Sequence, residues 1–115
     1  MKLENILKVN KETNEVKIVD FGIAGLYAGR KSEITKAGSI NYLPPEIFKQ
    51  KNVVASPQLD IWAIGCILFA LVTGSLPFND KQESVIIQKI QELEPEYPKG
   101  VKLSTEVKDL ITQLL

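Results

Sequence analysis

The amino-acid sequence predicts a mainly α-helical fold of the α+β class. A short β-hairpin and a long irregular loop are expected to precede a buried helix and two amphipathic helices. Two β-branched runs near the N-terminus predict the hairpin, and a near-continuous apolar run at residues 61–72 predicts the buried helix. Apolar residues spaced three and four apart in the last third of the chain predict the amphipathic helices.

The composition is that of a globular protein with 115 residues, about the size of one small domain. Its 14 basic residues balance 14 acidic ones, and no basic stripe is present that could neutralise backbone phosphates, so we expect no nucleic-acid partner. The N-terminus has no long apolar stretch of the kind that a secretory signal requires, and the apolar run at residues 61–72 is too short to span a bilayer. We therefore expect no membrane partner and a cytoplasmic location. The single cysteine, Cys66, lies in the apolar run and is expected to be buried and inert, which suits a reducing compartment.

The hairpin is predicted from residues 6–9 and 15–19, which flank a polar segment of turn-forming residues. The second strand leads directly into Asp20-Phe21-Gly22, so a carboxylate stands where the strand ends. Functional side chains often occupy such positions. From residue 22 to residue 42 no periodicity persists, which predicts a long irregular loop.

The helices are predicted from capping residues and periodicity. Residues 46–51 follow Pro44-Pro45 and could form a short helix that begins at proline. Ser56-Pro57 is typical of a helix start, with Ser56 as the cap, and the apolar helix that follows is expected to be buried on all sides as far as Gly74.

The two amphipathic helices have their own start signals. Asp80 and Glu83 have the spacing of a capping box, and Ser104 can cap the last helix. The apolar faces comprise, in the first helix, Val85, Ile86, Ile87, Ile90 and Leu93, and in the second, Val107, Leu110, Ile111 and Leu114. Because no stop signal precedes Leu115, we expect the chain to be cut within a longer sequence.

Several short motifs, taken in order, resemble the serine/threonine protein kinase signature from the catalytic loop onward. They are Lys2, Asn5, Asp20-Phe21-Gly22, Gly38-Ser39, Tyr42, Pro45-Glu46, Asp60-x-Trp62 and Gly65. The resemblance covers the whole chain and is strongest to the calcium/calmodulin-dependent and energy-sensing group. It implies that residues 1–115 are a single partial protein kinase domain, the C-lobe without its N-lobe, and that the cofactors are ATP and Mg²⁺.

The resemblance implies a metal site at the open end of the hairpin. Phosphoryl transfer from ATP needs oxygen ligands for Mg²⁺, and Asn5 and Asp20 supply an amide oxygen and a carboxylate. By resemblance, Asp20 bridges metal and phosphates, Phe21 packs to set the active or inactive geometry, and Gly22 lets the loop turn. Alone, each motif could be an ordinary turn or cap; their order and spacing favour the metal site.

The substrate end of the site is implied by four residues. Lys2 resembles the lysine that neutralises charge on the transferring phosphoryl group, and Ser39 resembles the hydroxyl residue that steadies the substrate-facing loop. Both favour serine and threonine of a protein substrate as acceptors. Tyr42 belongs to the same loop, or is simply a half-buried aromatic whose hydroxyl finds a partner. Thr35 is either the phosphorylation site of an upstream activating kinase or an unmodified exposed threonine.

The remaining motif residues are expected to be structural. By resemblance, Asp60 accepts amide hydrogen bonds from the catalytic-loop backbone, Trp62 lies in the core, and Gly65 belongs to the start of the long helix. Glu46 normally pairs with an arginine that would lie beyond Leu115.

One part of the kinase pattern is missing. In His-Arg-Asp-Leu-x-x-x-Asn, the aspartate that acts as catalytic base would fall immediately before Met1. The arginine that clasps a phosphorylated activation loop would precede that aspartate and is missing too. Loss of a general base typically costs about 10²- to 10⁴-fold in rate, so we expect the chain alone to be inactive. The alternative is a non-catalytic binding or regulatory module that uses surfaces normally covered by the N-lobe.

Overall fold

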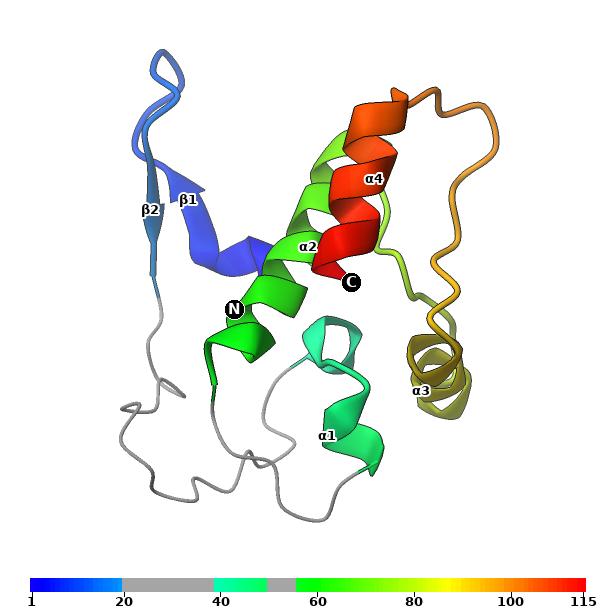
Figure 1. Ribbon diagram of the computed structural model, residues 1–115. Helices are drawn as coiled ribbons and strands as arrows, with labels where there is room; N and C mark the ends of the chain where they lie inside the picture. Colours follow the sequence, from blue (N-terminus) through cyan, green and yellow to red (C-terminus); the bar gives the residue numbers. More distant parts are fainter. Residues whose placement is uncertain (20–38, 50–55) are drawn as a thin grey trace.

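The computed structural model describes residues 1–19, 39–49 and 56–115 (Figure 1). The predicted mainly helical α+β class is confirmed: one small hairpin stands beside a group of helices, in which α2 and α4 lie against each other. Among the helices described, none is long and apolar enough to cross a membrane. The elements, in chain order, are the 3₁₀ helix η1 (Leu3–Asn5), β1 (Ile6–Lys8), β2 (Val16–Ile18), the 3₁₀ helix η2 (Ile40–Tyr42), α1 (Glu46–Lys49), α2 (Pro57–Thr73), α3 (Glu83–Glu92) and α4 (Thr105–Leu114).

The hairpin is antiparallel, with Ile6 opposite Ile18 and Lys8 opposite Val16. Its turn is held by Asn10, whose side-chain oxygen accepts the backbone N–H groups of residues 12 and 13 at 2.9 and 2.8 Å, as asparagine often does in turns. The strands are shorter than predicted, but the hairpin prediction is confirmed.

Helix α2 runs through the centre of the fold. Pro57 occupies its first turn, and Gly74 ends it with φ 80°, a left-handed conformation that glycine adopts without steric cost. Two expectations are wrong. The Ser56 side chain makes no capping hydrogen bond, and α2 is not buried on all sides, because its neighbours cover only part of its surface and leave Leu71 67% exposed.

The main core lies between α2, η2 and α3. Its buried members are Tyr42, Trp62, Ala63, Cys66, Ile67, Phe78, Ile86 and Ile90. Outside this cluster, Phe69 of α2 and Ile111 of α4 are also fully buried. Gly65 permits the close approach of α4, since a Cβ atom there would lie only 2.9 Å from Cβ of Leu114 and from Cδ2 of Leu115.

The starts of α3 and α4 differ in how well the sequence predicts them. The cap at Ser104 is confirmed, because its Oγ accepts the N–H of Val107 at 3.3 Å. The capping box at Asp80 is wrong: α3 begins only at Glu83, and Asp80 instead accepts the N–H of Gln82 at 3.2 Å. The predicted apolar faces are also too wide, since Leu93 and Leu110 are exposed.

Burial makes the Cys66 thiol a sensitive probe of folding. The side chain is 0% exposed, and desolvation by burial raises the pKa of Cys66 to about 12. We expect no reaction with iodoacetamide at pH 8 in the native state, and complete alkylation in denaturant, because Cys66 is the single cysteine.

The pH dependence of stability follows the same shift. Because the folded-state pKa is raised, the thiol's contribution is fully present below pH 9 and is lost as pH rises from 9 to about 12. Between pH 9 and about pH 12, the free energy of unfolding of a Cys66→Ala variant, measured in urea titrations, should therefore fall less than that of the unsubstituted chain. For the alkylation experiment, reaction of native Cys66 with iodoacetamide at pH 8, at the rate of the denatured chain, would contradict the burial of this side chain.

Candidate active site

The segment that carries Lys2 and Asn5 is a single tight turn. The N–H of Asn5 donates to the carbonyl of Lys2 at 3.1 Å, and η1 then continues directly into β1. The N–H of Val19 donates to the carbonyl of Asn5 at 2.8 Å, which extends the pairing of the two strands back to the predicted metal ligand. The residue that precedes Asp20 in the chain is therefore hydrogen-bonded to Asn5.

Four of the predicted site residues lie outside the described residues: Asp20, Phe21, Gly22 and Thr35. Their placement stays a prediction. Among the described residues no group of three His, Cys, Asp or Glu side chains could hold a metal ion. The Asn5 amide and the Asp20 carboxylate offer hard oxygen donors of the kind that Mg²⁺ prefers, so the chemistry of this donor pair fits the ion.

Tyr42 connects the predicted substrate-facing loop to η1. Its ring is buried in the core, and its hydroxyl donates to Oε2 of Glu4 at 3.3 Å. Burial raises the pKa of Tyr42; the Leu3 backbone opposes this shift, and the negative charge of Glu4 adds to it. The hydrogen bond to Glu4 therefore joins η2 to η1, and the motif spacing did not reveal Glu4 as the partner.

Ser39 precedes η2, and Asn41 is its middle residue. Ser39 is exposed, and its carbonyl accepts the N–H of Tyr42 at 3.0 Å. Nδ2 of Asn41 donates to the carbonyl of Phe78 at 2.8 Å, which fastens η2 to the connection between α2 and α3. No local pattern could predict this contact, because its two residues are 37 positions apart in the chain.

The structural residues of the motif are placed as follows. Trp62 is buried and stacks on Phe78, with ring centroids 5.7 Å apart. Gly65 lies under the end of α4, and Glu46 opens α1 as a partly exposed residue.

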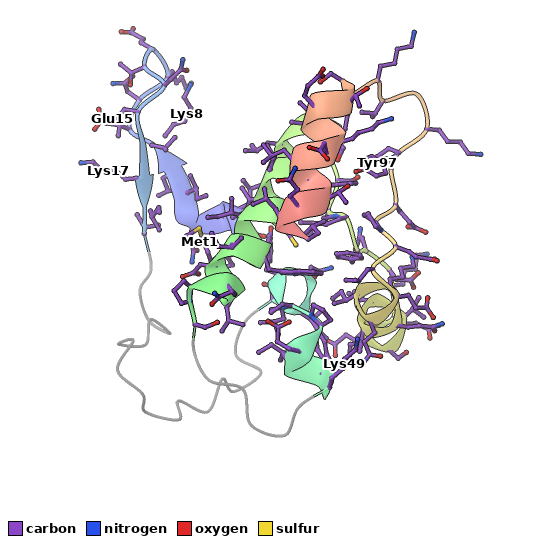
Figure 2. The ribbon with its side chains drawn as sticks, viewed as in Figure 1. Met1, Lys8, Glu15, Lys17, Lys49 and Tyr97 are labelled. Carbon is purple, nitrogen blue, oxygen red and sulfur yellow. The ribbon has the colours of Figure 1, made fainter. Side chains whose placement is uncertain are left out.

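The carboxylate of Asp60 lies beside the predicted catalytic segment. Its Oδ1 lies 3.5 Å from the Met1 ammonium, beside the start of α2 where Figure 2 labels Met1. The amide hydrogen bonds expected of Asp60 stay a prediction. With the Asp60 side chain 62% exposed, its ion pair with Met1 contributes little to stability.

A surface cleft of about 510 Å³ lies elsewhere, between the α2–α3 connection and the segment that follows α3. Tyr97, labelled in Figure 2, forms part of its wall and packs its ring 4.9 Å from that of Phe69. The cleft is lined by Ser75, Leu76, Asn79, Glu96, Tyr97, Pro98 and Lys99, so none of the residues predicted for phosphoryl transfer contributes to it.

Comparison with known protein families decides the assignment. The model of the protein kinase domain matches residues 1–115, the whole chain. The chain belongs to the protein kinase family. The predicted resemblance to eukaryotic serine/threonine kinases is thereby confirmed, and the named relatives fit the calcium/calmodulin-dependent and energy-sensing group.

Three relatives illustrate the similarity of this kinase chain to larger proteins, and each match covers 100% of it. It is 39% identical to the probable serine/threonine-protein kinase HSL1 of Saccharomyces cerevisiae, of which it covers 7%. It is 36% identical to the protein kinase kin1 of Schizosaccharomyces pombe and covers 12% of that protein. It is also 36% identical to the carbon catabolite-derepressing protein kinase of Secale cereale and covers 22%. The chain thus spans less than a quarter of the length of these three relatives.

Proposed function

We propose that this chain supplies the metal-binding and substrate-facing half of a serine/threonine protein kinase site. The observation that carries the proposal is the hydrogen bond from Val19 to the Asn5 carbonyl, at 2.8 Å. It brings the end of β2, from which Asp20 follows, to the residue that would share the metal. Bound Mg²⁺ would neutralise charge on the ATP phosphates and fix their orientation.

The chain's own residues have distinct roles in this proposal. Asn5 and Asp20 hold the metal through an amide oxygen and a carboxylate, and Lys2 places an ammonium beside the transferring phosphoryl group. Because η1 is a tight turn that begins just after Lys2, the ammonium and the Asn5 amide are borne by one short segment.

The acceptor is proposed to be a serine or threonine hydroxyl of a protein substrate. The exposed Ser39 would face this substrate, and the buried Tyr42 would hold the loop in place. The support is the contact between Tyr42 and Glu4, at 3.3 Å, which joins the loop after residue 38 to η1. Thr35 would be phosphorylated by an upstream kinase, since about −1.5 to −2 added charges can order a loop against basic groups.

We further propose that the 115-residue polypeptide is inactive by itself. Its sequence holds no counterpart of the catalytic aspartate or of the elements that clamp adenine and phosphates. A second function, as a non-catalytic binding module, is favoured by one observation: Leu7, Val9, Val16 and Ile18 leave the hairpin with exposed apolar side chains.

A chimera tests the enzyme proposal. The 115 residues would replace the aligned segment of the carbon catabolite-derepressing protein kinase of Secale cereale, 36% identical over that segment. We expect the chimera to transfer phosphate from Mg·ATP to serine and threonine in a peptide library, and the polypeptide alone to transfer none. A chimera that unfolds cooperatively but transfers no phosphate would favour the binding module.

A further inference from the structure

The side chain of Asn41 joins two segments that the sequence keeps far apart. Its Nδ2 donates to the backbone carbonyl of Phe78 at 2.8 Å, and the two residues are 37 positions apart. Asn41 itself is partly buried, so this hydrogen bond is shielded from competing water on part of its surface.

The acceptor belongs to a buried, well-packed part of the fold. The Phe78 ring is 0% exposed and stacks on Trp62 with an interplanar angle of 8°. Pro77, directly before it, is also fully buried, and its carbonyl accepts the N–H of Glu96 at 2.9 Å. The Phe78 carbonyl is therefore fixed by packing on one side and by a backbone hydrogen bond beside it.

The donor belongs to a short 3₁₀ helix that needs support. Within η2 the backbone bonds are those of a single turn, from Tyr42 to Ser39 at 3.0 Å and from Leu43 to Ile40 at 3.1 Å. Short 3₁₀ turns have poor hydrogen-bond geometry and are weakly stable by themselves. In the part of the chain that the structure describes, η2 gains two side-chain hydrogen bonds to other segments, through Asn41 and Tyr42.

We infer that Asn41 is a positioning residue that holds the substrate-facing loop, Ser39 to Tyr42, against the α2–α3 connection. The inference rests on the proposed function, which assigns this loop to the protein substrate. Tyr42 fastens the same loop to η1 through Glu4. The side chains of Asn41 and Tyr42 therefore hold the loop through two different segments. Asn41 acts only through the loop and is expected to affect peptide binding more than ATP binding.

Hydrogen exchange on the 115-residue chain tests the structural step without any activity. Asn41→Asp keeps the size of the side chain but replaces the amide donor with a carboxylate that repels the Phe78 carbonyl. Loss of one partly buried hydrogen bond corresponds to about 5- to 10-fold, so the Tyr42 and Leu43 amides should exchange faster by that factor. Asn79→Asp is the matched control: it makes the same change one residue beyond Phe78, on an exposed side chain.

The amides of α4 report whether the variants fold, and Asn41→Ala provides a second variant without the added charge. If α4 stays protected and the Tyr42 and Leu43 amides exchange at the same rate in Asn41→Asp, Asn41→Ala and the unsubstituted chain, the inference is wrong.

Kinetics of the chimera separate positioning from a merely structural role. We expect Asn41→Asp to raise the KM for peptide about 5- to 10-fold, with the KM for ATP and kcat within about twofold, and Asn79→Asp to change none of them. Equal losses in peptide and ATP parameters, or an unchanged KM for peptide, would overturn the inference. A chimera inactive without any substitution would refute the proposed function, while the exchange rates would still decide whether Asn41 holds the loop.

Discussion

Replacement of Phe78 by alanine is expected to lower the free energy of unfolding by about 3–5 kcal/mol, the usual cost of removing a fully buried phenylalanine ring. The ring has no exposed surface and stacks on Trp62 at 5.7 Å, so its removal leaves a cavity and takes away an aromatic contact. Urea unfolding can be followed through the fluorescence of Trp62, the single tryptophan in the chain.

Two controls make this result specific. Phe78→Leu keeps much of the buried volume and should cost clearly less than Phe78→Ala. Leu71→Ala truncates a side chain that is 67% exposed and should change stability by less than about 0.5 kcal/mol. If Phe78→Ala is no more destabilising than Leu71→Ala, the core between α2, η2 and α3 is not packed as described.

In the chimera, Lys2→Met is expected to lower kcat about 10²- to 10³-fold, the range found when one group that stabilises transition-state charge is removed. The methionine side chain has a similar length and no charge, so the ammonium is the main loss. Peptide phosphorylation measured over a range of ATP and peptide concentrations gives kcat and both KM values.

Lys17→Met provides the matched control, because Lys17 is an exposed lysine on β2, where Figure 2 shows it on the hairpin. Lys2→Arg should lose less activity than Lys2→Met, since the charge remains. If Lys2→Met and Lys17→Met lower kcat equally, or if Lys2→Met changes kcat by less than twofold, then Lys2 is a solvated lysine that takes no part in the reaction.

Local features of the fold could be predicted from the sequence. The hairpin follows from two β-branched runs and the Asn10 turn, and the limits of α2 follow from Pro57 and Gly74, whose backbone preferences act within a few residues. The Ser104 cap is local in the same sense. Each of these features depends on short-range sterics or hydrogen bonds, which the neighbouring residues alone determine.

Features that depend on distant partners could not be predicted. The apolar composition of α2 indicated complete burial, but burial depends on how many elements surround the helix, and Leu71 remains exposed. Asp80 had the spacing for a cap, yet Lys89 lies 3.4 Å from its carboxylate and Gln82 occupies the cap position.

The site shows the same division. The order and spacing of short motifs predicted Lys2 and Asn5 as site residues, and in the structure the N–H of Val19 donates to the Asn5 carbonyl. The side chains that fasten η2, Asn41 to Phe78 and Tyr42 to Glu4, join positions 37 and 38 residues apart, and no local pattern could reveal them.

A change of metal preference at residue 20 tests most directly whether this chain binds the catalytic metal. Asp20→Cys in the chimera replaces a hard carboxylate with a soft thiolate, which favours soft metals over Mg²⁺. We expect this variant to lose activity in Mg²⁺ and to regain part of it in Cd²⁺. In contrast, Glu15→Cys, which replaces an exposed carboxylate of the hairpin, should remain active in Mg²⁺. Full activity of Asp20→Cys in Mg²⁺, or the same response to Cd²⁺ in both variants, would contradict the proposed metal site.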